Sequence, residues 1–379
     1  MPSTVYLDHA ATSYPKPSAV LTAVTDCMKQ SGGNPGRGSH SLALAAAREI
    51  YACRETAAAL FGASPERVIF TLNTTHALNL AIKGGLERGG HALCSDMEHN
   101  SVYRPLYRLA AEGRVDFDVF DTFPAEAPST DRILSSLLSK IRPDTKMVVC
   151  AHASNICSAT LPIAAIGSLC RRMGILFVVD AAQSAGHIPL DIERMNIDAL
   201  CLPGHKGLLG PQGTGMLILG KHMNPDTLLE GGNGIDSLRG EMGDDVPERY
   251  EAGTLQTPAI AGLRAGMDYV KAVGIEAIGE RERRLYGSLR DRLSTLPRVR
   301  LYAPKPMGGV LLFSVEGYAS EEVGKRLNAE GICVRTGFHC SALGHKTLKT
   351  PADGAVRVSF GHTSKERDAD AIWKALKKF

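Results

Sequence analysis

The sequence predicts an α/β fold: a large domain built on a mostly parallel seven-stranded sheet, and a smaller C-terminal α+β domain. Up to about residue 258, short β-branched runs alternate with segments of helical hydrophobic spacing. This rhythm is typical of a parallel sheet with helices on both faces. After Thr257-Pro258 the pattern changes to a long polar helix and then to mixed strands and helices. We therefore predict two domains, residues 1–258 and 259–379.

Seven apolar runs in the first part have the length of strands. Two helices stand among them: Ser41–Phe61, which ends at Gly62, and a second helix over about residues 75–83. Gly213-Thr214-Gly215 predicts a tight hairpin before the seventh run. The predicted strands cover residues 68–71, 92–94, 115–120, 147–151, 177–179, 200–202 and 216–219.

The second part has the composition of a separate α+β unit. One long polar helix is predicted over about residues 260–296, and a shorter one over 320–330. The last helix is predicted to open at Thr363, with Glu366 completing a capping box. The predicted strands cover residues 309–314, 332–334 and 355–359.

Composition excludes several classes of protein. A chain of 379 residues with 44% hydrophobic residues is long enough for two domains. A net charge of +3, with no basic run except Lys377-Lys378, predicts no nucleic-acid partner. The N-terminus lacks the features of a signal peptide, and no apolar stretch is long enough to cross a bilayer. We therefore expect a soluble, cytoplasmic protein without a membrane partner.

The nine cysteines show no Cys-x-x-Cys or His-x₃-His spacing. This argues against a disulfide framework and predicts no metal site. Most are expected to be buried small hydrophobes, since Cys150, Cys201 and Cys333 lie in or beside apolar runs. Cys340 differs, because it stands in a polar, loop-like segment.

An acid and a lysine follow two predicted strands. Asp180 ends one apolar run, and Lys206 stands just past the next, within Pro203-Gly204-His205-Lys206-Gly207. Open α/β sheets bind ligands at the carboxyl ends of their strands. A lysine that forms a Schiff base and an aspartate that keeps a pyridine nitrogen protonated are what an enzyme needs to hold pyridoxal phosphate. Either residue alone would more often be a solvated loop residue or a cap.

Further polar residues follow other strands of the predicted sheet. Thr74 and Thr75 open a helix, where free N–H groups and hydroxyls could hold the cofactor phosphate, although either threonine could be a simple cap. His99 could stack on the pyridine ring or be an ordinary loop histidine. Asn155 ends yet another strand. The convergence of several strand ends favours a site.

Seven short motifs follow one another along the chain. They are Asp8-His9-Ala10-Ala11-Thr12, Asn34-Pro35-Gly36-Arg37, Glu98-His99-Asn100-Ser101, Asp180-Ala181-Ala182-Gln183, Gly204-His205-Lys206, Glu251-Ala252-Gly253-Thr254 and Arg335-Thr336-Gly337-Phe338-His339-Cys340. In this order they resemble the motifs of the class V aminotransferase-fold enzymes, specifically the cysteine desulfurase and selenocysteine lyase group. The resemblance implies a fold-type I, pyridoxal phosphate-dependent homodimer with active sites at the subunit interface, releasing sulfur from L-cysteine as alanine forms.

The resemblance also implies a role for each site residue. Lys206 would carry the Schiff base, Asp180 would pair with the pyridinium nitrogen, and His99 would stack on the ring. Gln183 would touch the phenolic oxygen, and Asn155 and Arg357 would hold the substrate carboxylate. The phosphate would be bound by Thr75 and His205, with Thr74 beside them and Thr254 reaching in from the partner subunit.

Cys340 decides which chemistry the resemblance implies. In the desulfurases the corresponding cysteine attacks the substrate sulfur and becomes a persulfide. Gly337 would give its loop freedom, and Arg335 and His339 would favour the thiolate. The segment from Cys340 to Arg357 is short, so a sulfur-acceptor protein would have to approach the cysteine.

Three departures from the commoner family pattern leave the acceptor and the natural element open. Pro203 replaces a Ser or Thr, Phe338 replaces a His, and His76 replaces an acid. A selenocysteine lyase acting on L-selenocysteine, or another class V lyase or aminotransferase, would use the same residues. A catalytically silent scaffold has no need of Lys206, Asp180, His99 and Cys340 together.

Overall fold

The computed structural model describes residues 4–36, 38–124, 126, 128–235, 237–303, 305 and 308–379. Arg37, which belongs to one of the seven motifs, lies outside the described residues. Among the described residues the strands form a seven-stranded sheet, a four-stranded sheet and a two-stranded sheet.

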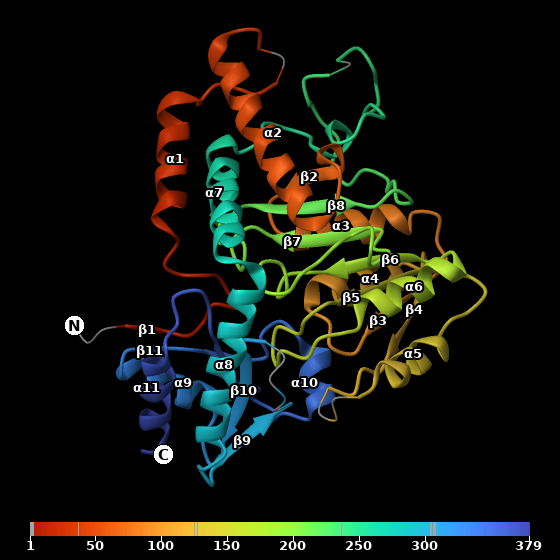
Figure 1. Ribbon diagram of the computed structural model, residues 1–379. Coiled ribbons are helices and arrows are strands. Elements are labelled where there is room, and N and C mark those ends of the chain that lie inside the picture. Colours follow the sequence, from red (N-terminus) through yellow and green to blue (C-terminus); the bar gives the residue numbers. More distant parts are fainter. Residues whose placement is uncertain are drawn as a thin grey trace.

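The large sheet confirms the predicted fold class, and all seven predicted strands are present in it (Figure 1). Its strand order is β2-β8-β7-β6-β5-β3-β4. Strand β8 is antiparallel to both of its neighbours, as the predicted hairpin requires, and the other neighbouring pairs are parallel. The strands are β2 (Val68–Thr71), β3 (His91–Ser95), β4 (Asp116–Phe120), β5 (Thr145–Ala151), β6 (Leu176–Asp180), β7 (Ala199–Pro203) and β8 (Gly215–Leu219).

Helices cover both faces of this sheet, which is why its central strands read as continuous apolar runs. One apolar core joins one sheet face to α2, α5, α6 and α7, and a second joins the other face to α3 and α4. The helices of this part are α1 (Ser18–Gln30), α2 (Ser41–Phe61), α3 (Thr74–Gly85), α4 (Asn100–Ala111), α5 (Thr130–Leu138) and α6 (Ile163–Met173), with short 3₁₀ turns η1 (Pro65–Arg67) and η2 (Glu248–Tyr250).

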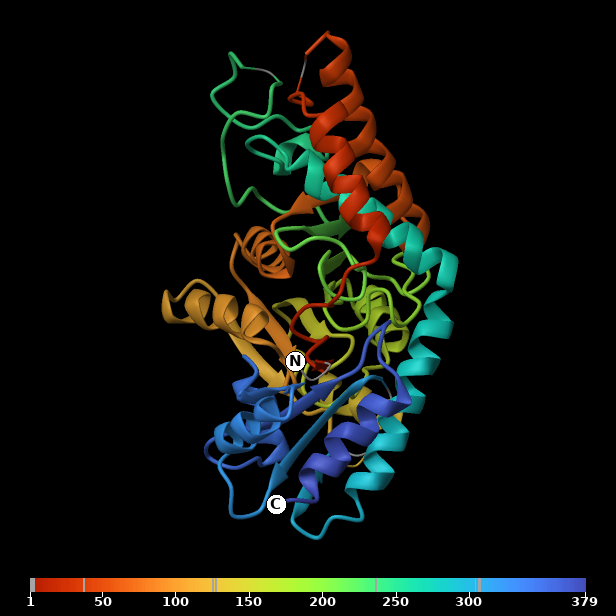
Figure 2. The same ribbon diagram turned by 90° about the vertical axis from the view of Figure 1, so that its left-hand side faces the viewer.

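The second part holds an antiparallel sheet of order β12-β13-β10-β9, with its own apolar core. Figure 2 shows α7 and α8 as a long column that runs from α1 and α2 down to this sheet. The elements are α7 (Thr257–Val273), α8 (Ile275–Leu293), β9 (Val299–Tyr302), β10 (Val310–Val315), α9 (Ser320–Ala329), β11 (Ile332–Cys333), β12 (Arg335–Gly337), α10 (Ala342–Leu348), β13 (Ala355–Ser359) and α11 (Glu366–Leu376).

Two predictions for the second part are wrong in detail. The single long helix over 260–296 is two helices, because Gly274 adopts φ +92° and ψ 126° between α7 and α8. The last helix begins at Glu366 rather than Thr363. Its capping carboxylate belongs to Asp368, which accepts a hydrogen bond from the Lys365 N–H at 2.7 Å.

The N-terminal segment is joined to the second part of the chain. Strand β1 (Val5–Tyr6) pairs in parallel with β11, and Asp8 forms a bridge with Ser359. Residues 5–8 therefore pair with strands of the second part although they precede the large sheet in the chain. The division into residues 1–258 and 259–379 stays a prediction.

Candidate active site

Eight of the residues predicted for the site line one cavity of about 530 Å³. They come from five different places in the chain, and most stand at the carboxyl ends of the strands of the large sheet. Asn73, Ser101, Ala151, Ala153 and Ala182 complete the wall. The eight are Thr74, Thr75, His99, Asn155, Asp180, Gln183, His205 and Lys206.

Asp180 and Lys206 enter the cavity from neighbouring parallel strands. Asp180 is the last residue of β6, and Lys206 follows the end of β7 by three residues. The Lys206 turn is held from the N-terminal segment: the Ser13 hydroxyl donates to the Lys206 carbonyl at 2.9 Å, and the Lys16 amine donates to the His205 carbonyl at 2.7 Å. Backbone contacts thus fix the turn and leave the Lys206 side chain for the cavity.

Burial dominates the titration of both groups. It lowers the pKa of the Lys206 amine to about 8, although the nearby Asp180 carboxylate opposes the shift. Burial also raises the pKa of Asp180, while a 2.9 Å hydrogen bond from the Ala182 N–H to Oδ1 and the charge of Lys206 act in the other direction. Near neutral pH a much larger fraction of the Lys206 amine than of an ordinary lysine is therefore unprotonated and able to react with an aldehyde.

His99 borders the cavity as a neutral imidazole. Burial, with the charges of Lys206 and Arg357, lowers its pKa to about 4. Its Nδ1 caps α4 by accepting the Ser101 N–H at 3.0 Å, so the ring proton sits on Nε2. The cap fixes the position of a flat, uncharged ring at the wall of the cavity.

The polar end of the cavity lies at the N-terminus of α3. Asn73 caps this helix by accepting the His76 N–H at 3.0 Å, so neither Thr74 nor Thr75 is needed as the cap. The Thr75 hydroxyl lies 2.7 Å from that of Ser101. Burial lowers the pKa of His205 to about 4, so His205 offers an anion a neutral N–H rather than a positive charge.

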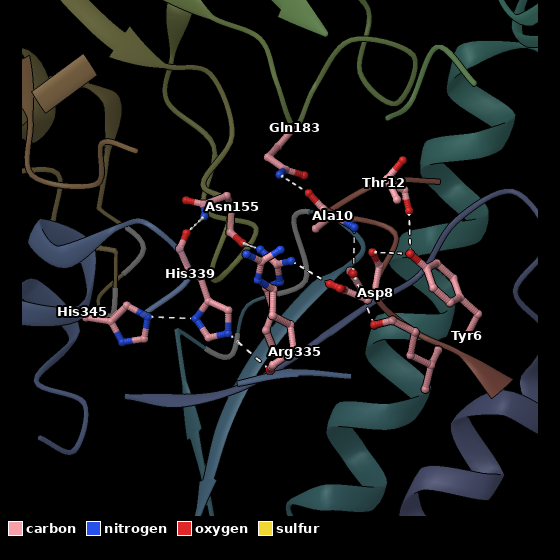
Figure 3. A network of polar contacts seen from close by, with 12 residues as sticks. Tyr6, Asp8, Ala10, Thr12, Asn155, Gln183, Arg335, His339 and His345 are labelled. Carbon is pink, nitrogen blue, oxygen red and sulfur yellow. Dashed lines mark hydrogen bonds and ion pairs between the residues drawn. The ribbon is translucent and has the colours of Figure 1, made fainter. Parts of the chain in front are cut away.

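The predicted carboxylate-binding pair is already hydrogen bonded. The Asn155 amide donates to the His339 carbonyl at 2.8 Å (Figure 3). Arg357 donates to the Asn155 carbonyl at 3.0 Å. Arg357 also forms a 2.8 Å ion pair with Asp8, while its Nε is buried without a partner among the described residues. Gln183 lies beside them and donates to the Ala10 carbonyl at 3.0 Å. Arg357 does not line the cavity itself.

Two predicted residues lie outside the cavity. Thr254 lines a separate groove with Asn34, Gly232 and the buried Arg54–Glu251 ion pair, so this chain alone does not bring it to Lys206. Cys340 is exposed at the edge of a neighbouring groove. That groove shares Thr75, His99 and Ser101 with the cavity.

The backbone around Cys340 is unusual for its residue types. His339 and Cys340 both adopt left-handed conformations, with φ +51° and +56°, which residues other than glycine seldom do. His339, which was expected with Arg335 to favour the thiolate, is neutral. Burial lowers its pKa to about 3, and the neutral ring stacks on His345, with His339 Nδ1 3.0 Å from His345 Nε2. Arg335 is exposed and is left as the charged neighbour.

Cys340 is also the one exposed cysteine. Seven others are buried, among them Cys150 and Cys201 as predicted, while Cys333 is half-buried. All nine are free thiols.

Among the described residues, no cluster of three or more His, Cys, Asp or Glu side chains is arranged to hold a metal ion. Within the same ranges, no helix combines the length and the apolar character needed to cross a membrane.

Sequence reasoning missed three contributors to the site. Asn73 and Ser101 line the cavity, and Asp8 pairs with Arg357. Ser101 and Asp8 stand within quoted motifs, and Asn73 directly precedes Thr74. All three residues therefore stand in or beside segments that the sequence analysis had already selected. Only the folded chain shows which polar side chains of those segments take part in the site.

Comparison with known proteins identifies the family of this chain. The Aminotransferase class-V family model matches residues 5–372. A probable cysteine desulfurase of Methanothermobacter thermautotrophicus is 33% identical over 384 residues, covering 99% of this chain and 94% of its own length. The apo structure of a cysteine desulfurase from Thermococcus onnurineus NA1 is 29% identical, with a TM-score of 0.90 and the same coverages. A cysteine desulfurase from Escherichia coli is 25% identical, with a TM-score of 0.87, over 99% of this chain and 94% of that one.

These neighbours share the whole architecture, so the predicted fold-type I arrangement is confirmed. The chain therefore belongs to the aminotransferase class-V family, in the group of the cysteine desulfurases.

Proposed function

We propose that this protein is a pyridoxal phosphate-dependent cysteine desulfurase that converts L-cysteine to L-alanine and transfers the sulfur to its own Cys340 as a persulfide. The observation that carries the proposal is one cavity that collects eight polar residues, among them the Lys206 amine and the buried Asp180 carboxylate. The exposed Cys340 lies in a groove that shares part of its wall.

The residues present fit pyridoxal phosphate. The cavity offers a primary amine for an aldehyde and a buried carboxylate for a pyridinium nitrogen, with the neutral His99 ring at its wall. At its other end, helix α3 presents its N-terminus with Thr74 and Thr75, a favourable place for a phosphate. A neutral His205 adds an N–H donor.

Each of these residues has a role in binding and orientation. Lys206 would hold the cofactor covalently, and Asp180 would keep the ring nitrogen protonated. His99 would stack on the ring, and Gln183 would contact the phenolic oxygen. Thr74, Thr75 and His205 would bind the phosphate. Asn155 and Arg357 would hold the substrate carboxylate, which would have to compete with Asp8 for the guanidinium.

When bound, pyridoxal phosphate supplies the electron sink that stabilises negative charge at the substrate Cα. The Lys206 amine, once free, accepts the Cα proton. The Cys340 sulfur attacks the substrate sulfur; the Cβ–S bond breaks, and the carbon side ends as L-alanine after protonation. The balance is L-cysteine plus Cys340 thiol to L-alanine plus Cys340 persulfide, with no external oxidant.

A homodimer completes the site in this proposal. Thr254 would bind the phosphate of the partner subunit, because it faces a groove away from Lys206 in its own chain. Helices α1 and α2 leave large apolar side chains exposed, which an interface would cover: Leu21, Met28, Leu42, Leu44 and Tyr51. The cytoplasmic location stays a prediction from the sequence.

One assay tests the proposal against its alternatives. Purified protein loaded with pyridoxal phosphate should be yellow, and with L-cysteine and a reducing thiol it should form equal amounts of sulfide and alanine. Formation of a keto acid that keeps the sulfur would indicate an aminotransferase, pyruvate with sulfide and ammonia would indicate an eliminating lyase, and activity on L-selenocysteine alone would indicate a selenocysteine lyase. A colourless protein that takes up no cofactor would overturn the proposal.

A further inference from the structure

A basic groove leads away from Cys340 between two packed helices. Helix α3 contributes Thr75, Asn79 and Lys83 to its wall, and α4 contributes Asn100, Ser101, Arg104, Pro105 and Arg108. The α3 residues stand four apart, and the α4 residues recur at one- and three-residue steps that match the helical turn, so each set lies along one face of its helix. Eight residues of helix span about 12 Å. The groove, of about 760 Å³, is therefore two helical turns long and open to solvent, with Cys340 and His99 at its inner end.

The charges in this groove are of one sign. Lys83, Arg104 and Arg108 line it, and no Asp or Glu does so in the part of the chain that the structure describes. Arg108 is ion paired with Glu112 at 2.5 Å, which offsets its charge. Lys83 and Arg104 form no ion pair within the described ranges, although the Lys83 charge also acts on the Glu112 carboxylate. Three cations against the Glu112 carboxylate thus leave a net positive charge along the groove.

The Cys340 segment is anchored rather than free to travel. The Cys340 carbonyl accepts the Asn100 N–H at 2.7 Å, and the Ser341 hydroxyl donates to the Glu98 carbonyl at 3.1 Å. On the other side, Asn155 holds the His339 carbonyl. Ser341 is fully buried, and helix α10 begins directly after it. A sulfur atom on Cys340 therefore stays at the groove, and its acceptor has to come to it.

We propose that this groove, defined by Lys83, Arg104 and Arg108, docks an acidic segment of a sulfur-acceptor protein whose cysteine reaches Cys340. This inference rests on the proposed function, because it needs a persulfide on Cys340. The acceptor thiolate attacks the outer sulfur of the persulfide, the S–S bond breaks, and Cys340 leaves as a thiolate. One sulfur atom is transferred, and no further oxidant or reductant is consumed.

Two properties of the groove favour a protein segment as the occupant. It is open along its length, whereas small-molecule sites enclose most of their ligand. Its cations are spread over both helices instead of converging on one point. Such an arrangement complements a row of carboxylates on an extended or helical segment, and attraction of this kind mainly raises the rate of encounter.

The test measures the transfer step alone. Protein carrying a ³⁵S-labelled persulfide, formed by one turnover with labelled L-cysteine, is mixed with a peptide that has one cysteine among glutamates. Matched peptides carry glutamine or lysine in place of glutamate. We expect the glutamate peptide to accept label about tenfold faster than the glutamine peptide at low ionic strength, and this advantage to fade as salt screens the charges. Equal rates for the three peptides at low salt would overturn the inference.

A charge-reversal pair assigns the effect to the groove. K83E/R104E should remove the preference for the glutamate peptide and favour the lysine peptide. The control R194E/K221E reverses two exposed cations that are paired with Asp191 and Glu193, away from the cavity and the groove, and should keep the preference. Loss of the preference in the control as well would indicate an effect of net charge and contradict docking in the groove. If no label reaches Cys340 in the parent protein, the proposed function itself fails, a result distinct from equal peptide rates.

Discussion

Lys206 is half-buried and Asp180 is buried, and desolvation opposes the charged form of both. An isolated buried charge is costly, and each group moderates the shift in the pKa of the other. This arrangement gives an amine that is reactive near neutral pH and a carboxylate that gains a partner when a pyridinium nitrogen binds. The chemistry of the site thus depends on the environments of single side chains.

The pKa of Lys206 sets the pH dependence of cofactor uptake. An aldehyde condenses with the neutral amine, and a pKa lowered to about 8 makes that form dominant above about pH 8. The rate at which cofactor-free protein takes up pyridoxal phosphate should therefore rise up to about pH 8 and then level off. Stopped-flow absorbance measures this rate. A rate that climbs steadily to pH 10 would show an unshifted lysine.

Replacing Asp180 should weaken the ability of the cofactor ring to accept electrons, while the cofactor itself stays bound. Asp180→Asn leaves the ring nitrogen without an ionic partner, and we expect turnover to fall by roughly a thousandfold. Asp180→Glu should recover part of the loss. Steady-state alanine formation gives the rates, and retained yellow colour shows that the cofactor is still bound. Near-normal turnover in Asp180→Asn would mean that another group pairs with the nitrogen.

Cys340 should be needed more for removing sulfur from L-cysteine than for removing selenium from L-selenocysteine. The C–Se bond is weaker and needs less help from a nucleophile, so Cys340→Ala should lose nearly all sulfide formation from L-cysteine and keep substantial activity on L-selenocysteine. Cys333→Ala, which removes the next most accessible thiol, is the control. Alkylation after one turnover and peptide mass analysis should locate the persulfide on Cys340. A persulfide on another cysteine would contradict the mechanism.

At the scale of elements, one buried ion pair joins three segments beside the Thr254 groove. Arg54 on α2 binds both oxygens of Glu251, at 2.9 and 2.6 Å, and Glu251 also accepts the Phe70 N–H of β2 at 2.7 Å. The pair therefore positions the segment that carries Thr254 against the large sheet. Its importance lies in that connection, because a buried ion pair adds little net stability over apolar packing.

Removing one partner of this pair should be strongly destabilising. Arg54→Met leaves Glu251 buried without its counter-ion, and we expect a loss of about 3–5 kcal/mol in the free energy of unfolding. Lys325→Met, which breaks an exposed pair with Glu321, is the control and should leave stability nearly unchanged. Urea denaturation of cofactor-free protein at fixed concentration measures both. Equal effects of the two substitutions would mean that the buried pair does not support the fold.

At the scale of the whole molecule, the proposed site would need a second copy of the chain to include Thr254. The cavity holds Lys206 and the groove holds Thr254, and they open at different places. An isologous dimer could bring the Thr254 of each chain to the Lys206 cavity of the other. Assembly and catalysis would then depend on the same interface.

Mixed dimers test this arrangement. Lys206→Ala and Thr254→Glu should each be nearly inactive, the second because its carboxylate repels the phosphate. After the two variants are unfolded together and refolded, half of the dimers are mixed, and each mixed dimer has one intact site. About a quarter of the wild-type activity should return by this statistical pairing. No recovery, or a fully active monomer in light scattering, would contradict a shared site.

The sequence by itself determined the alternation of strands and helices, the strand ends that carry Asp180 and Lys206, and the loop that carries Cys340. These follow from local patterns, because hydrophobic period and chain order decide which residues lie at the carboxyl edge of a parallel sheet. Local pattern did not reveal the break at Gly274 within the long helix. A single glycine within a helical pattern can either be tolerated inside the helix or end it, and the sequence does not distinguish the two cases.

Only the tertiary structure decided which side chains are charged, free or already bonded. Burial makes His339 neutral although the sequence shows a polar loop, and Arg357 is engaged by Asp8 from the opposite end of the chain. The same is true of the basic groove, whose cations come from two helices that pack together. Desolvation and contacts across hundreds of residues depend on three-dimensional packing, so no local pattern in the sequence could have predicted them.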